Sequence, residues 1–366
     1  MRVWIDLLTP KQVLFFEPVI DILKERGDEV IITSRRYREA ELMARKRELN
    51  VEFIGEHGGK LLADKLQASV ERTNLLTEKF RNNAPDIALN FSSPEAARVA
   101  FGLGVSNVCV NDSPHATATC RLTVPLTDML ITPWIIPDAA WTQYGIEKTK
   151  IARYKALDPF MWIKRRDLVN IQSPDIGLDN KKATIIVRLE ESFAAYIPAQ
   201  SDVGYTVEFA LLKRLVEEFR NYNIVVLCRY SEQIDTVLEN FKGRIIVPRD
   251  LVDGVALLLS SHLFIGMGGT MTAEAALLGI PSISFFRGSY FIERYLISKG
   301  LLTKPRDIEG VMRVSKNFLR NERISKEMVA RASKIRSGME DPSKTIVKKL
   351  DNIIIEKLNR PQIDRR

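Results

Sequence analysis

The sequence has few of the residues that build metal or disulfide sites. It contains three cysteines and three histidines in 366 residues. The cysteines are too few for a disulfide framework, and the histidines lie too far apart for a ligand pattern such as H-x-x-x-H. We therefore expect no structural disulfide, no bound metal and no required cofactor.

Long hydrophobic runs are also missing. The first apolar run, from Val3 to Leu8, ends before Lys11, and no other stretch approaches the roughly 20 apolar residues that a membrane-spanning helix needs. The same run lacks the length and the small-residue cleavage site of a secretory signal. These absences predict a cytoplasmic protein.

No run of five or six like charges occurs, although the net charge is +8. Such a charge fits an anionic partner, which could be nucleic acid, a membrane surface or a phosphate-bearing substrate. Nucleic acid is disfavoured, because no stretch interleaves basic with aromatic residues and no helix pattern gathers Lys and Arg on one face. The charge and the apolar clusters Phe15-Phe16 and Phe160-Met-Trp162 suggest instead a peripheral contact with the inner face of a membrane.

Short β-branched runs alternate with helical patterns, as in parallel βαβ units. The first half has expected strands at 3–7, 29–33, 51–54, 86–91, 107–110 and 129–132, and the second half at 183–189, 224–229, 244–247, 263–266 and 282–285. Residues 134–180 lose this alternation and are interpreted as a connector. The sequence thus predicts an α/β protein of two parallel-sheet, Rossmann-like domains, at 1–170 and 171–366.

A last helix is expected over residues 340–360. Asp341-Pro342 is a typical helix start, and an apolar stripe follows it. The stripe consists of Ile346, Val347, Leu350, Ile353, Ile354 and Leu358. We expect it to pack on another part of the chain.

A glycine-rich turn in the second half carries the clearest chemical signal. The expected strand at 263–266 leads into Gly268, Gly269 and Thr270 and then directly into a helix that carries Glu274. The first N–H groups of a helix are unpaired and favour negative charge, so a diphosphate can bind there. Thr270 could cap the helix or donate to a phosphate, and Glu274 could accept from ribose hydroxyls. A tight turn followed by a solvent-facing acid remains the alternative interpretation.

Two arginines end neighbouring strands of the same predicted domain. Arg188 lies at the end of the strand at 183–189, and Arg229 ends the strand at 224–229. Ligands of open α/β sheets bind at the carboxyl ends of the strands, so both arginines are candidates to face a phosphate.

Polar clusters follow two strands of the first half. Asp112 or His115 could take the proton of an attacking hydroxyl near neutral pH. Glu95, a carboxylate after the preceding strand, is a third candidate catalytic residue, since a carboxylate there could steady the positive charge that develops on a sugar. The alternative is a turn at 112–114 that caps the next helix. The two clusters are Ser92, Ser93 and Glu95, and Asn111, Asp112 and His115.

The strand, Gly-Gly-Thr turn, Glu274 and following Ala-Ala-Leu-Leu-Gly-Ile-Pro resemble the donor site of GT-B glycosyltransferases. The first half more specifically resembles the domain of unknown function 354 family. The residues that carry this resemblance are Trp4-Ile-Asp-Leu, Phe15-Phe-Glu-Pro18, Glu56-His-Gly-Gly59, Ser93-Pro-Glu-Ala-Ala-Arg98 and Asn111-Asp112.

The resemblance implies a GT-B fold with two domains facing a central cleft and a last helix that crosses back to the first domain. It also implies a nucleotide-sugar donor, with UDP as the expected nucleotide, bound by the second domain through Gly268, Gly269, Thr270 and Glu274. The first domain would then present an acceptor, either a polysaccharide or a lipid-linked glycan. A homodimer is left open.

Three reaction classes remain open. We predict glycosyl transfer. UDP-N-acetylglucosamine 2-epimerases share the fold, but their histidine-arginine-arginine-glutamate-asparagine signature aligns with Val187-Arg188-Leu189-Glu190-Glu191, so its histidine is absent. A non-catalytic protein that binds a nucleotide sugar or another anion is the third possibility.

Overall fold

The computed structural model describes residues 1–59, 61–189, 202–228 and 231–359. The chain divides into two compact units, and each is described by itself. Unit 1 consists of Met1–Trp162 with Glu340–Arg366, and unit 2 of Ile163–Met339.

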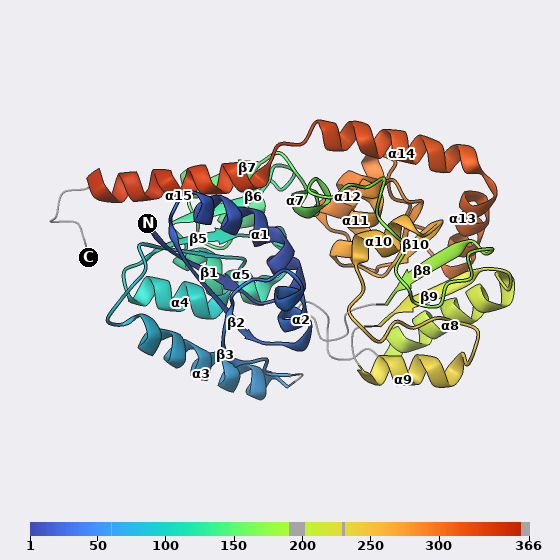
Figure 1. The fold of residues 1–366 in the computed structure, drawn as a ribbon, viewed down its shortest axis with the longest axis horizontal. Coiled ribbons are helices and arrows are strands. Elements are labelled where there is room, and N and C mark those ends of the chain that lie inside the picture. Colours follow the sequence, from blue (N-terminus) through green and yellow to red (C-terminus); the bar gives the residue numbers. More distant parts are fainter. Residues whose placement is uncertain (60, 190–201, 229–230, 360–366) are drawn as a thin grey trace. The chain divides into compact units, whose positions relative to one another are not determined.

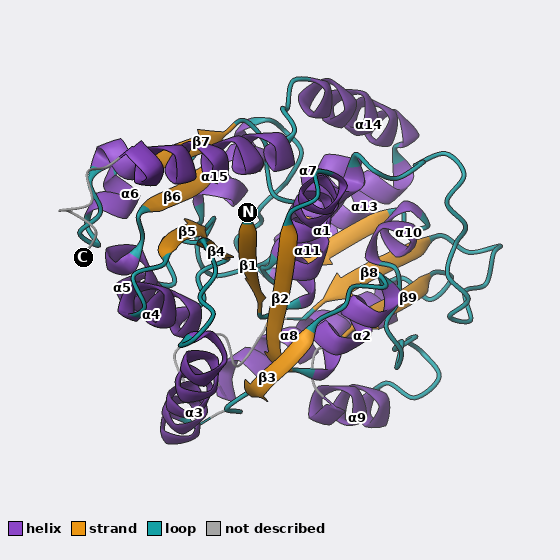
Figure 2. Ribbon diagram, turned by 60° about the vertical axis from the view of Figure 1, so that its left-hand side comes forward, coloured by secondary structure: helices purple, strands orange, loops and turns teal. Residues whose placement is uncertain are grey.

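Unit 1 is built on a seven-stranded parallel sheet with the strand order β3-β2-β1-β4-β5-β6-β7 (Figure 2). Its inner strands β1, β4 and β5 are buried almost throughout, as expected for a parallel sheet that helices cover on both faces. The strands are β1 (Arg2–Leu7), β2 (Glu29–Arg36), β3 (Glu52–Glu56), β4 (Ile87–Asn90), β5 (Ser106–Val110), β6 (Met129–Pro133) and β7 (Ile151–Tyr154).

Helices α3 and α4 pack against each other, and α1 packs against α2 and α15 (Figure 1). The α1–α15 contact includes an ion pair between Arg26 and Asp351, at 2.9 Å. The C-terminal helix therefore belongs to the unit that contains the N-terminus. The helices are α1 (Pro10–Glu25), α2 (Arg38–Lys46), α3 (Leu62–Phe80), α4 (Pro94–Gly102), α5 (Thr117–Thr123), α6 (Ala139–Thr142), α7 (Phe160–Ile163) and α15 (Pro342–Asn359), with 3-10 turns at Val124–Leu126 and Lys148–Lys150.

Unit 2 contains a four-stranded parallel sheet with the order β11-β10-β8-β9. Its core gathers aliphatic side chains from all four strands and from α8, α13 and α14. The strands are β8 (Thr184–Arg188), β9 (Asn223–Leu227), β10 (Leu263–Gly266) and β11 (Ser282–Ser284). The helices are α8 (Asp202–Glu218), α9 (Ser231–Asn240), α10 (Gly254–Leu259), α11 (Thr270–Leu278), α12 (Phe291–Ser298), α13 (Ile308–Arg320) and α14 (Glu322–Ser337).

The structure differs from the expected strands at two places. The segment interpreted as a connector contains β7, whose four residues alternate between half-buried and buried at the end of the sheet. Conversely, the strand expected at 244–247 is reduced to an isolated bridge between Val225 and Ile246. Pro248 follows at once, and proline has no N–H group with which to extend the ladder.

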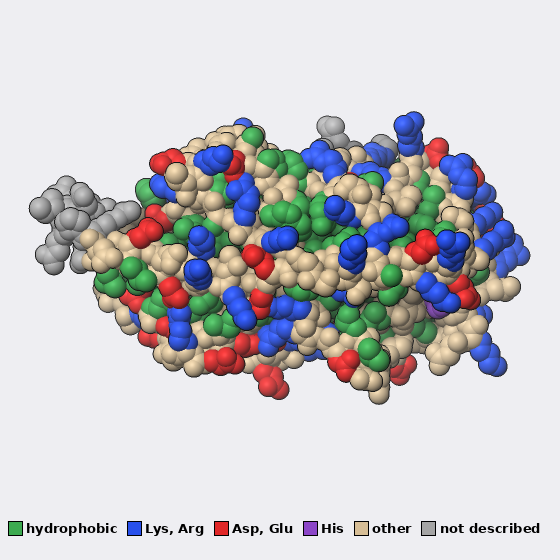
Figure 3. Space-filling view, turned by 90° about the horizontal axis from the view of Figure 1, so that it is seen from above, with side chains coloured by type: hydrophobic (Ala, Val, Ile, Leu, Met, Phe, Trp, Pro, Cys, Tyr) green, Lys and Arg blue, Asp and Glu red, His purple; other side chains and the backbone are tan. Residues whose placement is uncertain are grey.

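The apolar clusters taken as a membrane contact were interpreted wrongly. Phe15 and Phe16 are fully buried, and so is Met161. Phe15 packs edge-on against Phe91, with 5.3 Å between ring centroids. These side chains form core rather than surface. On the face in Figure 3, Lys and Arg side chains are spread among other residues over both units.

Candidate functional site

The glycine-rich turn of unit 2 lies where β10 ends and α11 begins. Gly268 and Gly269 have φ angles of +96° and +83°, a region that only glycine adopts without strain. Gly269 is the residue that precedes the helix, and it has no side chain to cap the first N–H groups. Thr270, predicted as a possible cap, is instead the first helical residue.

The space in front of this turn is open. A Cβ atom added to Gly269 would meet nothing within 4 Å, whereas one added to Gly268 would lie 3.0 Å from Phe286 Cδ2. Gly269 is exposed, and Gly268 and Thr270 are half-buried. An anion can therefore approach the uncapped start of α11 from the side of Gly269.

Glu274 lies one turn further along α11 and is buried. Arg188 ends β8, which pairs with β10, and its carbonyl accepts a hydrogen bond from Met267 N at 3.0 Å. Its guanidinium donates to the carbonyl of Cys228 at 3.3 Å. The pairing of β8 with β10 thus brings the backbone of Arg188 beside the glycine turn. Arg229 lies outside the described residues.

In unit 1, Asp112 lies in a buried cluster of charges. Lys11 Nζ, at the start of α1, lies 2.6 Å from Asp112 Oδ2 and 2.7 Å from Asp158 Oδ2. Tyr154 Oη, on β7, donates a hydrogen bond to Asp158. Lys11 follows β1, Asp112 follows β5 and Asp158 follows β7. The cluster therefore lies at the carboxyl edge of the sheet, where α/β proteins bind ligands.

The environment shifts the pKa values of the two carboxyl groups of this cluster in opposite directions. Burial raises the pKa of Asp158 to about 7, and the neighbouring Asp112 adds to this rise. Burial alone would also raise the pKa of Asp112, but the Lys11 ammonium holds it below its ordinary value. Burial alone would lower the pKa of Lys11, but the two carboxylates raise it overall.

His115 lies near the same cluster. Burial lowers the pKa of its imidazole to about 4, against an opposing effect of Asp112. His115 is therefore neutral at pH 7. The loop does not cap the next helix, because the residue before α5 is Ala116 and no side chain caps it. The structure thus brings Asp112 and His115 together without the capping role of the alternative interpretation.

Glu95, the third predicted catalytic residue, belongs to a different cluster. Its carboxylate accepts a hydrogen bond from Ser69 Oγ at 2.6 Å and lies 3.5 Å from Arg72 Nη1. Arg72 is fully buried and pairs with Asp6 at 2.6 Å. Ser93 accepts from Ala96 N and caps α4. The carboxylate of Glu95 is therefore held in place by Ser69 and Arg72 of α3.

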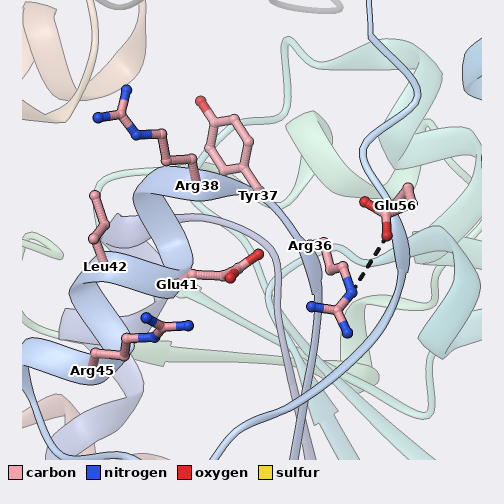
Figure 4. A pocket seen from close by; sticks show the side chains of 7 residues that line it. All are labelled: Arg36, Tyr37, Arg38, Glu41, Leu42, Arg45 and Glu56. Atoms are coloured by element: carbon pink, nitrogen blue, oxygen red, sulfur yellow. Dashed lines mark ion pairs between the residues drawn. The ribbon is translucent and has the colours of Figure 1, made fainter.

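Away from these residues, a cavity of about 320 Å³ opens at the ends of β2 and β3 (Figure 4). Its lining is polar and of mixed charge, with Arg36 directed toward Glu56 at 3.4 Å. A polar ligand fits such a lining better than an apolar one. The lining residues are Arg36, Tyr37, Arg38, Glu41, Leu42, Arg45 and Glu56.

Among the described residues, no group of three or more His, Cys, Asp or Glu side chains is placed to hold a metal ion. In the same part of the chain, no helix combines the length and the apolar character that crossing a membrane requires.

A family model described as "Protein of unknown function (DUF354)" matches residues 1–354. The chain belongs to this DUF354 family. An uncharacterised protein of Methanocaldococcus jannaschii is 29% identical over 326 residues, which cover 85% of this chain and 90% of the relative.

Solved structures of similar architecture are GT-B proteins. A Staphylococcus aureus MnaA structure with UDP has a TM-score of 0.75 at 16% identity and covers 99% of both chains. The UDP-GlcNAc 2-epimerase of Neisseria meningitidis, bound to UDP-GlcNAc, has a TM-score of 0.74 at 14% identity, covering 96% of this chain and 100% of the other. The spinosyn rhamnosyltransferase SpnG, complexed with spinosyn aglycone, has a TM-score of 0.62 at 14% identity with the same coverage. These likenesses show the GT-B fold of this DUF354 chain.

Sequence reasoning missed Lys11, Asp158 and the buried pair of Asp6 and Arg72. Asp158 lies in the segment interpreted as a connector, so its place after a strand was hidden. Asp6 does leave a signal, because it is an acid inside the apolar strand β1, and a buried acid needs a partner. For Lys11 the sequence gives no signal beyond its position after β1.

Proposed function

We propose that this DUF354 protein is a glycosyltransferase that uses a nucleotide-sugar donor, with UDP as the expected nucleotide. The observation that carries the proposal is the uncapped, open glycine turn before α11, at the carboxyl end of β10. In this proposal the donor diphosphate binds Gly268, Gly269 and Thr270. Glu274 accepts from the ribose hydroxyls, and Arg188 faces the phosphates. The UDP and UDP-GlcNAc complexes of structurally similar proteins support the choice of nucleotide.

The reaction would displace the diphosphate by an acceptor hydroxyl. The bond between the sugar C1 and the diphosphate oxygen breaks, and the diphosphate leaves with the electron pair. The acceptor oxygen bonds to C1, and its proton passes to Asp112 or His115. Both have the protonation state of a base at pH 7, since the pKa of His115 is about 4 and that of Asp112 is lowered. Glu95 would hold the start of α4 in position instead of reacting, because its carboxylate already binds Ser69 and Arg72.

The acceptor class belongs to the same proposal. The phenylalanines that suggested a lipid contact are buried, but Leu62, Leu66 and Val70 form an exposed stripe on one face of α3, with exposed fractions of 84%, 66% and 57%. A lipid-linked acceptor would find apolar surface there. Flotation with anionic liposomes tests it: the wild type should float, and Leu62→Gln with Leu66→Gln should not. A soluble polysaccharide acceptor predicts that neither protein floats.

Binding of a nucleotide sugar tests the donor proposal. A ligand that binds only the native state raises its melting temperature, so a thermal-shift screen of UDP-, TDP- and GDP-sugars should give at least one stabilising donor. Glu274→Gln should weaken the calorimetric affinity at least tenfold without lowering the melting temperature of the free protein. The matched control is Glu327→Gln, an exposed acid on α14 of the same unit. A screen without any hit, or equal affinities for both variants, would contradict the assignment.

A second candidate is an epimerase that acts on a UDP-N-acetylhexosamine. It is favoured by the pair Asp112 and Asp158, because two carboxyl groups with separated pKa values can serve as base and acid. Against it, Val187 stands where the epimerase signature has its histidine. UDP-GlcNAc in D2O separates the two: an epimerase introduces deuterium at C2, whereas transfer or hydrolysis leaves C2 unlabelled. Tight binding without either reaction would indicate the non-catalytic alternative.

A further inference from the structure

Lys11, Asp112 and Asp158 form a charge cluster that is not balanced. Two carboxyl groups share a single ammonium group, at 2.6 and 2.7 Å. The side chains are 19%, 11% and 1% exposed, in the same order, so solvent reaches Asp112 but not Asp158.

Among the described residues, the other groups that interact with this cluster, Tyr154 and His115, supply no second positive charge. Tyr154 is a neutral donor to Asp158, and burial raises the pKa of its hydroxyl well above the ordinary value. His115 is neutral at pH 7 because the pKa of its imidazole is about 4. Two ionised carboxylates would therefore leave one negative charge without compensation in the interior, which is strongly unfavourable.

The surroundings of the two carboxyl groups point to Asp158 as the protonated one. Within the described part of the chain, Oδ2 of Asp158 is buried beside the shared Lys11 ammonium, whereas the Asp112 carboxylate is partly exposed. The Asp112 carboxylate is in hydrogen-bonding contact with Asp158 and with Ser113. A proton on Asp158 supplies the missing charge and gives Asp158 a donor toward Asp112.

We propose that Asp158 and Lys11 are positioning residues of the acceptor-side base, in which Asp158 holds one proton that it shares with Asp112 while Lys11 keeps Asp112 ionised. This inference rests on the proposed glycosyl transfer and selects Asp112, the member of the pair that solvent reaches, as the group that accepts the hydroxyl proton. The pair holds one proton before the step and two after it. The second proton leaves to solvent through Asp112 when the product departs.

A titration without substrate tests the shared proton. Protein labelled with 13C at the aspartate carboxyl carbons should show one aspartate signal with a midpoint near pH 7. Asp158→Asn, which keeps the shape but cannot ionise, should abolish this midpoint, and Lys11→Met should raise it. The matched control is Asp138→Asn, since Asp138 also pairs with basic groups in unit 1 but is partly exposed. The inference is overturned if no aspartate titrates above about pH 5, or if the midpoint survives in Asp158→Asn.

Kinetics test the positioning role, using the nucleotide sugar found in the screen. Asp112→Asn should lower kcat by about 100-fold or more, the usual contribution of a general base. Asp158→Asn should lower kcat less, leave the donor affinity unchanged and remove the pH dependence of kcat near pH 7. Lys11→Arg, which retains the charge, should restore most of the kcat lost in Lys11→Met. A structural role alone would lower the melting temperature and leave the pH profile of the folded enzyme unaltered.

The two proposals fail in different ways. If no nucleotide sugar binds, the proposed function fails whatever the titration shows. If a donor binds and turns over but Asp158→Asn keeps the wild-type pH profile, the positioning role fails and the donor assignment stands.

Discussion

Replacing Arg72 by methionine should destabilise unit 1 by about 3 to 5 kcal/mol, because it removes the guanidinium that pairs with two buried acids. Arg72 lies on α3 and is 1% exposed. It contacts Asp6 at 2.6 and 3.1 Å and Glu95 at 3.5 Å, and it donates to the carbonyl of Ile54 at 2.9 Å. Asp6 is completely buried, so water cannot replace the lost guanidinium.

The magnitude follows from this burial. Removing one partner of a buried ion pair costs about 3 to 5 kcal/mol, whereas an exposed pair contributes about 0 to 1 kcal/mol. In a unit of this size 1 kcal/mol corresponds to roughly 2 to 4 °C, so the melting temperature of unit 1 should fall by roughly 6 to 20 °C. A second change, Asp6→Leu in the Arg72→Met background, should recover part of the loss by removing the orphaned charge.

Calorimetry measures the melting temperature, and hydrogen exchange locates the loss in unit 1. Arg81→Met is the matched control, since Arg81 follows the same helix and pairs with Glu78 at 3.0 Å, with both side chains 56% exposed. The control should melt within about 2 °C of the wild type. Equal losses in the two variants would refute the reasoning, because they would show that burial does not decide the cost.

Three further predictions concern other parts of the fold. Gly279→Ala should destabilise unit 2 by about 1 to 3 kcal/mol more than Gly243→Ala, since both glycines have positive φ but only the Cβ added at Gly279 meets backbone, 2.5 Å from Val329 Cα; equal urea midpoints would contradict this. Native Asp158 keeps its proton up to about pH 7, whereas the unfolded side chain loses its proton near pH 4. Asp158 therefore stabilises the fold fully below about pH 4, and this contribution is lost as the pH rises from about 4 to 7. Urea midpoints measured at each pH should consequently fall less over that range for Asp158→Asn than for the wild type. Cys109 and Cys120 are fully buried, and burial raises their thiol pKa values to about 11 and 12, so Ellman's reagent at pH 8 should label them only after unfolding; rapid labelling of the native protein would show that unit 1 opens.

Most of the fold could be predicted because most of its strands are short runs of consecutive apolar residues. Ten of the predicted strand segments coincide with strands of the two sheets. The exceptions are short or irregular. In β7 only Ala152 and Tyr154 are buried, so no continuous apolar run marks it. The segment at 244–247 does have such a run, but Pro248 ends its pairing.

The glycine-rich turn before α11 was predictable for a related reason, because its residues are consecutive. Glycines between a buried strand and a helix require a particular backbone, and the positive φ angles of Gly268 and Gly269 bear this out. The partners of Asp112 were not predictable in the same way. Lys11 and Asp158 lie 101 and 46 positions from Asp112 in the chain. Their side chains meet because the segments after β1, β5 and β7 all lie at the carboxyl edge of one parallel sheet.

The two charged clusters of unit 1 differ in their balance, and this difference suggests different roles. Asp6 and Glu95 pair with the guanidinium of Arg72, and both acids also interact electrostatically with Arg35. That cluster is neutral with every group ionised, so it can hold the framework without exchanging protons. At the cluster around Lys11 the acids outnumber the cations, and neutrality requires a proton. A group that must bind a proton near pH 7 to remain neutral can also release one there. The excess of one buried carboxyl therefore supports the proposed acid–base role of Asp112, whereas the Asp6–Arg72 pair has no such excess.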